Sequence, residues 1–279
     1  MMFRLSLSVC TLAVCLLKAG AAPVVSGCER DVLLAAASKY IAAQAAGNLD
    51  TLHDVLASNF TYKENNEITP IEKGVLSKAL KIDHNRTTAD TAACASFTEL
   101  ISASGPYTLA TQIRHDPETL AITLIDSIAA TKGAWLFDAA KTLQYVTQED
   151  WSPIPADRRD SRNLLRSAAD AYLDMWSNAT ASDAVPWGTP CTRLEGSVYT
   201  GRGLPSDSCT PGIPSNHNQK PNTHRRYVID ETMGSCSVLC LWEHMMNAAD
   251  SHEFRLEGGK LRYVHTMTCE KNIGDVPCF

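Results

Sequence analysis

An internal repeat is the feature that most restricts how this chain of 279 residues can fold. Two segments carry the same apolar stripe, with the spacing of three, four and seven residues that marks one face of an α-helix. The matching positions are Leu33, Ala36, Ala37, Tyr40 and Ile41 in the first half and Leu165, Ala168, Ala169, Tyr172 and Leu173 in the second. Each helix therefore has one side to bury, and the sequence predicts two related halves.

Strand-like segments follow the predicted helix in each half. Tyr107-Thr108-Leu109 and Tyr227-Val228-Ile229 each begin with a tyrosine, and apolar runs follow at 124–128 and 238–242. Helices come before strands, and strand-helix-strand alternation is missing. The order therefore predicts α+β domains rather than a parallel, doubly wound sheet.

A closing hairpin is expected at the end of each half, over residues 135–146 and over residues 254–264 with a Gly258-Gly259 turn. Between the halves, Trp151-Ser152-Pro153-Ile154-Pro155 is typical of a stiff, extended linker. The expected organisation is a first domain at 22–149, a linker at 150–160 and a second domain at 161–279.

One long segment, Thr200 to His224, is dense in Gly, Pro, Ser and Asn. It is long for a connection without regular structure, which favours a lid or a binding loop. The alternative is a surface insertion held in place by Cys209. The sequence leaves both interpretations open.

The N-terminus has the pattern of a secretory signal. Arg4 precedes an apolar run from Leu5 to Leu17, and Ala19-Gly20-Ala21 supplies small residues before a cleavage point. The run is too short to span a bilayer. We expect residues 1–21 to be a signal peptide, the mature chain to begin at Ala22, and the protein to be in the secretory pathway or extracellular.

Cysteine usage agrees with that compartment. The chain has 10 cysteines, and removal of the two in the predicted signal peptide leaves eight, an even number typical of a disulfide-bonded secreted protein. We expect a bridge from Cys28 to Cys94. Cys236 and Cys240 lie too far apart along an extended strand for an easy bridge to each other. A zinc site is the alternative use, but without a C-x-x-C pair or an H-E-x-x-H helix the sequence predicts no metal and no cofactor.

Three N-glycosylation sequons follow the predicted signal peptide, at Asn59, Asn85 and Asn178. The charge balance, 31 acidic against 25 basic residues without a long Lys/Arg run, indicates no nucleic-acid partner. The sequence also lacks a GxSxG elbow, a P-loop and a dinucleotide fingerprint, which argues against hydrolases, kinases and dehydrogenases.

Several short blocks carry a family resemblance. They are Tyr62-Lys63-Glu64-Asn65, Trp135-Leu136-Phe137-Asp138-Ala139, Val185-Pro186-Trp187-Gly188, Cys191-Thr192-Arg193-Leu194-Glu195-Gly196, Arg226-Tyr227-Val228-Ile229-Asp230-Glu231 and Lys260-Leu261-Arg262-Tyr263-Val264-His265-Thr266. With these blocks the chain resembles a family of secreted fungal proteins similar to the ketosteroid isomerase-like (SnoaL-like) class. The resemblance implies two tandem cone-shaped domains, each with helices packed on a curved antiparallel sheet around a pocket.

A subset of that family resembles the dimerising cyclases of fungal maleidride pathways, which join two maleic anhydride-type polyketide monomers into a ring. The resemblance implies a cofactor-independent cyclase with isomerase-type carbon-carbon bond formation in secondary metabolism. It also implies a small hydrophobic anhydride or polyketide as substrate, no membrane span, and an oligomer with itself or another pathway protein. The alternative is a secreted protein that binds small hydrophobic ligands without catalysis. A pocket lined by carboxylate, His and Arg favours the enzyme, and an all-apolar pocket favours the binding protein.

Coupling two such monomers needs a base, anion-binding cations and an apolar wall. Alternation along 226–231 places Arg226 and Asp230 on one strand face, either as a catalytic pair or as a structural ion pair. His265 shares a face with Tyr263 and is a candidate base or oxyanion donor, with a hydrogen-bonded core histidine as the alternative. These three, Asp230, Arg226 and His265, are the expected catalytic residues.

The expected substrate-binding residues lie nearby in the sequence. Arg193 and Glu195 face the same way if their segment is extended, and the planar fork of Arg193 suits a carboxylate or a ring-opened anhydride. Trp187 and Tyr199 are the candidates for apolar or hydrogen-bonding walls, although aromatic residues in such places are more often part of a core. Tyr263 is also expected to bind substrate. In the first half, the polar residues near pocket-forming segments are Tyr62, Glu64, His115 and Asp126.

Overall fold

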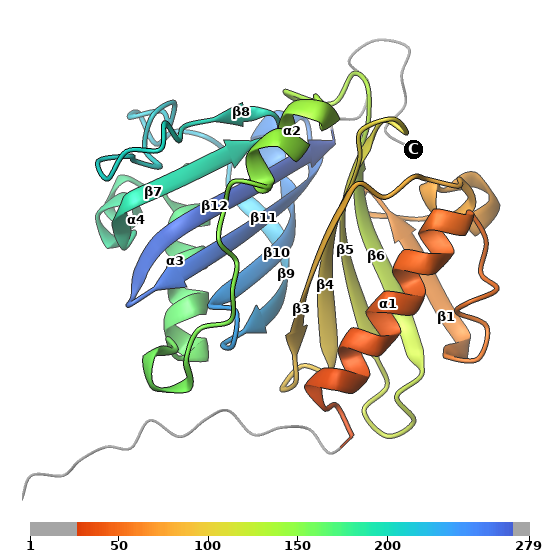
Figure 1. Ribbon diagram of the computed structural model, residues 1–279. Helices are drawn as coiled ribbons and strands as arrows, with labels where there is room; N and C mark the ends of the chain where they lie inside the picture. The colour runs from red at the N-terminus through yellow and green to blue at the C-terminus, as the bar shows by residue number, and fades with distance from the viewer. Residues whose placement is uncertain (1–26, 270–279) are drawn as a thin grey trace, which may run out of the picture.

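The computed structural model describes residues 27–269 as an α+β protein with two six-stranded sheets (Figure 1). The predicted signal peptide lies outside the described residues. The first half contains α1 (Arg30–Ala46), β1 (Leu56–Glu64), β2 (Glu67–Ile68), η1 (Ile71–Lys73), η2 (Val75–Ser77), β3 (His84–Asp90), β4 (Ala95–Ser102), β5 (Tyr107–His115), β6 (Ile122–Ala130) and α2 (Ala139–Val146). The second contains η3 (Ala156–Arg158), α3 (Arg162–Asp174), α4 (Ala179–Ala184), β7 (Trp187–Glu195), β8 (Val198–Tyr199), β9 (Asn222–Asp230), β10 (Ser235–Trp242), η4 (Glu243–Met245), β11 (Ala248–Glu257) and β12 (Lys260–Cys269).

The two sheets have the same strand order, β2-β1-β6-β5-β4-β3 and β8-β7-β12-β11-β10-β9. In each, a four-strand antiparallel meander ends beside the first strand of the half, so that β1 pairs with β6 and β7 with β12 in parallel. The expectation of purely antiparallel sheets was therefore wrong. The reason is that the whole meander acts as the long connection that a parallel pair requires.

Helices α1 and α3 occupy equivalent places, each packed on its own sheet, and both bury the repeated stripe. Leu33, Ala36, Ala37 and Tyr40 are buried in α1, and Leu165 through Leu173 bury the equivalent face of α3. The Tyr40 hydroxyl also forms a hydrogen bond with Thr111 Oγ1 on β5 at 2.8 Å, and this contact attaches α1 to the sheet. The repeat predicted from the sequence thus identified the buried faces of both helices.

The region predicted as the first closing hairpin, residues 135–146, instead contains helix α2. Asp138 caps its N-terminus by accepting the N–H of Lys141, and Ala139, Thr142 and Val146 are buried at helical spacing. The second closing hairpin is confirmed, since β11 and β12 meet at Gly258 and Gly259, which both have positive φ. Residues 139–146 therefore form a capped helix, although their composition resembles that of a strand.

The two halves pack sheet against sheet. Small and apolar side chains from β4, β5 and β6 meet those of β9 to β12 in one cluster, whose members include Ala95, Phe97, Ala110, Val228 and Leu239. The helices α1 and α3 cover the other face of each sheet (Figure 1). Each sheet is therefore buried on both sides, and buried charged residues such as Arg86, Asp126 and Asp230 lie in ion pairs.

The predicted disulfide between Cys28 and Cys94 is confirmed, and a second joins Cys191 on β7 to Cys209 in the long loop. Cys269 is also disulfide-bonded, whereas Cys236 and Cys240 are free and buried. These bridges fit an oxidising environment. Among residues 27–269, the helices are all too short or too polar to cross a membrane.

Candidate functional site

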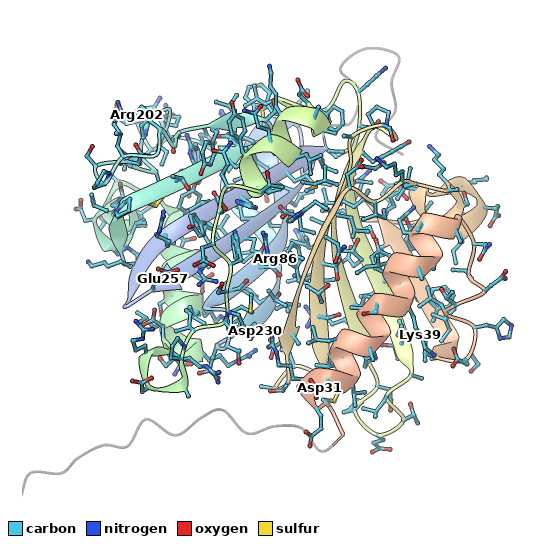
Figure 2. The ribbon with its side chains drawn as sticks, viewed as in Figure 1. Asp31, Lys39, Arg86, Arg202, Asp230 and Glu257 are labelled. Carbon is cyan, nitrogen blue, oxygen red and sulfur yellow. A yellow bond between two sulfur atoms is a disulfide. The ribbon has the colours of Figure 1, made fainter. Side chains whose placement is uncertain are left out.

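The predicted catalytic pair Arg226 and Asp230 does not form. Both side chains lie on the same face of β9, as expected, but each binds the first half: Arg226 Nε donates to Asp126 at 2.6 Å, and Asp230 accepts from Arg30 at 2.6 Å. Figure 2 shows Asp230, with Arg86, in the zone between the two sheets. These two predicted catalytic residues therefore hold the halves together, because the sheet face that presents them is the interface.

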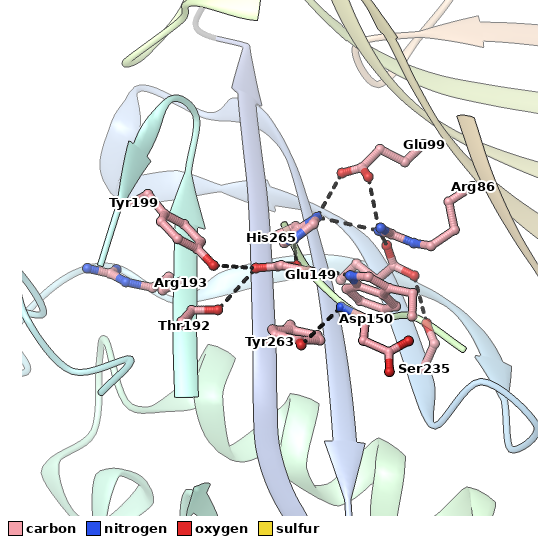
Figure 3. Close-up of polar contacts among 12 residues, drawn as sticks. Arg86, Glu99, Glu149, Asp150, Thr192, Arg193, Tyr199, Ser235, Tyr263 and His265 are labelled. Atoms are coloured by element: carbon pink, nitrogen blue, oxygen red, sulfur yellow. Dashed lines mark hydrogen bonds and ion pairs between the residues drawn. The ribbon is translucent and has the colours of Figure 1, made fainter. Parts of the chain in front are cut away.

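His265 lies at the centre of a buried charge network, which is shown in Figure 3. Its Nδ1 is 2.9 Å from Glu99 on β4, and its Nε2 is 2.6 Å from Glu149 in the segment after α2. Arg86 on β3 pairs with Glu99 at 3.0 Å and with Glu253 on β11. The network thus joins strands of both halves with the segment that connects them.

The electrostatics of this network make His265 a proton donor rather than a base. Burial alone would lower the pKa of His265, but Glu149 and Glu99 outweigh it and raise that pKa to about 10. Burial likewise favours the protonated form of Glu149, yet the positive charge of His265 leaves the pKa of Glu149 below its usual value. At neutral pH the pair is therefore an imidazolium beside a carboxylate.

Glu149 connects the network to a surface pocket. Its Oε1 accepts hydrogen bonds from Thr192 Oγ1 at 3.0 Å and from the Tyr199 hydroxyl at 3.2 Å, and its Oε2 accepts from Trp151 Nε1 at 2.9 Å. A cavity of about 350 Å³, which we call the tyrosine pocket, opens over these groups. Its lining residues are Gln148, Glu149, Pro190, Thr192, Tyr199, Gly203, Leu204, Pro205, Asp207, Arg262 and Tyr263. This volume is in the range of small-molecule sites.

Two of the predicted substrate-binding residues, Tyr199 and Tyr263, line this pocket. Tyr199 stacks on Tyr145 with ring centroids 4.6 Å apart, and the Tyr263 hydroxyl accepts the N–H of Asp150 at 3.2 Å. The long loop adds another wall through residues 203–207, and the Cys191–Cys209 disulfide anchors it. The long loop is therefore attached to β7 through Cys209, and part of it also forms a wall of the cavity.

Arg262, like Glu149, is a pocket residue that was not predicted from the sequence. Tyr263 pairs with Arg255 and Leu261 with Leu256, so Arg262 is left over as a bulge residue between two paired positions of β12. A bulge re-aims a side chain relative to simple alternation. The guanidinium lies 4.3 Å from the Tyr263 ring centroid, and its buried Nη1 has no hydrogen-bond partner among residues 27–269. Arg262 therefore lines the pocket and carries a buried cationic donor that the described residues leave unsatisfied.

The remaining predicted binding residues lie outside the tyrosine pocket. Arg193 and Glu195 do face the same way and form an ion pair at 2.6 Å, so their charges neutralise each other. Arg193 also donates to the carbonyl of Pro211 at 2.5 Å, which anchors the long loop. Trp187 packs on Tyr172, at 5.9 Å between centroids, in the core of the second half.

The candidates in the first half have structural partners. The Tyr62 hydroxyl donates to Glu64 at 2.6 Å, and Glu64 also accepts the N–H of Val75. His115 Nδ1 contacts the carbonyl of Leu120 at 2.9 Å. Asp126 binds Arg226, as described above. Tyr62 itself belongs to the packed core under α1.

A second surface cavity of about 610 Å³ runs along the segment between the halves. Its lining residues are Asp150, Ser152, Pro153, Ile154, Pro155, Arg158, Arg255, Glu257 and Gly258. Arg255 in this cavity is fully engaged, since it donates to Glu257, to the carbonyl of Met233 and to the carbonyl of Ser152. In the described part of the chain, the arginine of the tyrosine pocket retains a donor without a partner, and this pocket is therefore the better candidate.

Comparison with known proteins assigns no activity. Residues 158–268 match the family described as "Domain of unknown function (DUF8021)", a match confined to the second half. The chain is also similar to the crystal structure of an NTF2-like protein from Bacteroides fragilis NCTC 9343, with 8% sequence identity, 81% of this chain and 94% of that chain covered, and a TM-score of 0.20. A score this low carries no argument about fold. No curated protein matches the sequence.

Proposed function

We propose that this chain is a cofactor-independent dimerising cyclase that joins two maleic anhydride-type polyketide monomers, and that the tyrosine pocket is its site. The observation that supports the proposal most is Arg262, which lines a cavity of about 350 Å³ and whose buried Nη1 lacks a partner among the described residues. A guanidinium in such a place is suited to a carboxylate or a ring-opened anhydride. The aromatic rings of Tyr199 and Tyr263 supply the apolar wall.

The charge state of the pocket favours one route to the carbanion. Glu149 is a weak base, because His265 lowers its pKa and four side-chain donors already bind its two oxygens. Loss of a substrate carboxylate as CO₂ needs no base, and the electron pair left behind forms the new carbon-carbon bond to the second monomer. The resulting enolate closes the ring by adding to the first monomer, and solvent then supplies a proton to the enolate formed in that second addition.

Tyr199 is the group placed to bind that enolate. Burial, together with the charge of Glu149, raises the pKa of Tyr199 to about 12, so the hydroxyl keeps its proton. Its single proton is donated to Glu149 in the structure, so in this proposal the hydroxyl turns that hydrogen bond from Glu149 to the developing oxyanion, which is the type of contact that stabilises such transition states. In this proposal Arg262 positions the carboxylate and Tyr199 binds the oxygen that becomes negative.

The alternative function is binding of a small hydrophobic ligand without catalysis. It is favoured by the pairing of Glu149 with His265 at 2.6 Å, which leaves neither group free for acid-base work. Leu204, Pro190 and Pro205 supply apolar lining that either function would use. The two functions differ in whether the bound molecule changes.

The fold class of the two halves is part of the same proposal. We assign both halves to the ketosteroid isomerase-like (SnoaL-like) class, because each places a helix on a sheet of the same strand order. The secretory location is supported by the disulfides and by exposed asparagines at all three sequons. The fungal origin and the pathway rest on the sequence resemblance alone.

The test is incubation of the purified, glycosylated mature protein with a maleic anhydride monomer that bears an unsaturated alkyl chain and a free carboxylate. Dimer formation is followed by mass spectrometry against a heat-killed control. We expect enzyme-dependent dimer that Arg262→Gln reduces and Lys260→Gln, an exposed cation on the same strand, does not. Binding of the monomer without dimer would support the alternative function. Absence of both binding and dimer would contradict the proposed substrate class.

A further inference from the structure

A second group of reactive side chains lies inside the second half, away from the tyrosine pocket. Cys240 on β10 pairs in register with Asp250 on β11, and His252 follows two residues later on the same face of β11. Cys240 Sγ is 3.7 Å from Asp250 Oδ2, and His252 Nδ1 is 3.1 Å from the same oxygen. The three ligand atoms all lie within 4.8 Å of one another, and all three residues are buried.

The contact between His252 and Asp250 is close but is not a hydrogen bond. His252 Nδ1 lies within ion-pair distance of Asp250 Oδ2, yet its orientation leaves it without a hydrogen-bond partner among the described residues. The His252 side chain is 7% exposed. A buried polar nitrogen without a partner is destabilising unless something else binds it. The nitrogen and the carboxylate oxygen are arranged as two ligands of a common ion.

The surroundings of this group are polar and contain space. A cavity of about 10 Å³ adjoins it, with Trp176, Asn222 and Thr266 among its lining residues. Trp176 Nε1, Asn222 Oδ1 and Thr266 Oγ1 are buried atoms without hydrogen-bond partners in the described part of the chain. A volume of this size accommodates about one water molecule and is too small for an organic ligand. Polar atoms that face such a cavity fit an ion with a bound water.

We propose that Cys240, Asp250 and His252 bind a zinc ion whose fourth ligand is a water in this cavity. The mixed sulfur, nitrogen and oxygen donors suit zinc, whose bonds of ~2.0–2.3 Å in a tetrahedral site place ligand atoms ~3.3–3.7 Å apart. The separations of 3.7 and 3.1 Å are close to that range. The thiol gives its proton to solvent when the ion binds.

The neighbouring residues are arranged as in a supported metal site. Thr268 Oγ1 donates to Asp250 Oδ1 at 2.9 Å, so the other carboxylate oxygen, Oδ2, remains for the ion. The His252 ring stacks on Phe254 at 5.8 Å and contacts Tyr172 at 5.6 Å, which fixes its orientation. These contacts hold the ligands in place without occupying their free atoms.

The network around His265 is a weaker metal candidate. Glu99, Glu253 and His265 also bring three ligand atoms close together. Arg86 already binds both carboxylates there, and the raised pKa of His265 keeps its ring protonated. Among the described residues, no arginine or lysine binds Asp250 or His252 in this way. The site also goes beyond the cyclase proposal because it shares no residue with the tyrosine pocket.

The test is metal titration of the full mature chain after removal of bound metal with a chelator. We expect one equivalent of Zn²⁺ to bind and to raise the melting temperature, and Co²⁺ to give a thiolate-to-cobalt absorption band. Cys240→Ser and His252→Gln should each weaken binding by more than ~100-fold, since even loss of a second-layer partner weakens binding ~10- to 100-fold. Cys236→Ser is the matched control, a free buried cysteine on the same strand.

Failure of wild-type protein to bind an equivalent of zinc would overturn the proposal, whether or not the variants fold. Equal loss of binding in Cys236→Ser and Cys240→Ser, or unchanged binding in Cys240→Ser, would also overturn it. The Arg262→Gln variant should bind zinc as wild type does. That result separates the zinc site from the proposed activity of the tyrosine pocket.

Discussion

Asp90 and Asp230 are structural equivalents, because each is the last residue of an edge strand in its half. Each carboxylate accepts hydrogen bonds from the arginine that begins the first α-helix of the other half, α3 or α1. Arg162 binds both oxygens of Asp90 at 2.6 and 2.8 Å, and Arg30 binds Asp230 at 2.6 Å. The contacts are reciprocal, as in an isologous interface of a two-fold dimer. The single chain therefore contains the interface that two copies of one half would form.

Backbone groups complete this relationship. Asp90 Oδ2 accepts the N–H of Ile229, and Asp230 Oδ2 accepts the N–H of Ala89, both at 2.8 Å. Each carboxylate thus bridges the edge strand of the other half and the start of a helix. The apolar cluster between the sheets supplies burial, while these pairs fix the orientation of one half on the other.

Asp90→Ala should lower the free energy of unfolding by about 3 kcal/mol. The substitution leaves Arg162 and two backbone N–H groups without their buried partner, and removal of one partner of a buried ion pair costs about 3–5 kcal/mol. Urea unfolding checks the value. Asp54→Ala is the control, because Asp54 forms an exposed pair with Lys39 and its loss should leave the urea midpoint unchanged. Equal effects of the two substitutions would contradict this account of the interface.

Stability should fall as the pH rises from about 6.5 towards 10. His265 has a pKa raised from 6.5 to about 10, because Glu149 and Glu99 outweigh the effect of burial. The protonated His265 ring contributes fully to the free energy of unfolding below its pKa in the unfolded chain. This contribution is lost as the pH rises through its pKa in the folded protein. We expect His265→Gln to be less stable than wild type at pH 6 and the difference to shrink by pH 9.5. A difference that stays constant across this range would show that His265 is not protonated in the fold.

Removal of the Cys191–Cys209 bridge should disturb the tyrosine pocket as well as stability. The bridge closes a segment with a sequence separation of 18 residues that includes the pocket wall at 203–207. Loop-closure entropy predicts a loss of about 3 kcal/mol for Cys191→Ser with Cys209→Ser. Ligand affinity should fall in the double variant and stay unchanged in Cys236→Ser. Unchanged affinity in the double variant would show that the loop does not contribute to ligand binding.

All three sequons should be occupied when the protein passes through a eukaryotic secretory pathway. Asn59, Asn85 and Asn178 are exposed, and so each is accessible for glycan attachment. Treatment of the secreted protein with a glycan-removing amidase should lower its mass by three glycans. Each single Asn→Gln substitution should remove one. A secreted protein whose mass does not change would contradict the predicted occupancy of the sequons, and retention of the protein inside the cell would contradict the secretory assignment.

The sequence predicted the parts of the fold that depend on local pattern. The stripes of Leu33 and Leu165 identified equivalent buried helix faces, and the Gly258-Gly259 turn identified a hairpin. Helix α2 was missed because its start depends on one capping contact, from Asp138 to Lys141. The parallel pairing of the first and last strands was also missed, since it depends on the arrangement of the whole meander.

The site was harder to predict because its residues come from different strands. His265 and Tyr199 were identified by residue type, but their partner Glu149 lies in the segment between the halves. Arg262 was missed because a bulge breaks the alternation on which the face assignment relied. Asp230 was assigned to a site instead of an interface, since a single strand does not reveal which sheet face packs on another domain.

The most direct test of the central claim, that the tyrosine pocket is the small-molecule site, is calorimetric titration of the mature protein with the ring-opened dicarboxylate form of an alkylated maleic anhydride. We predict that wild type and Lys260→Gln bind with the same affinity, and that Arg262→Gln binds about 10-fold more weakly, the effect of losing a charged hydrogen bond worth roughly 1.5 kcal/mol. Equal affinity in wild type and Arg262→Gln would contradict the claim and place binding elsewhere on the molecule.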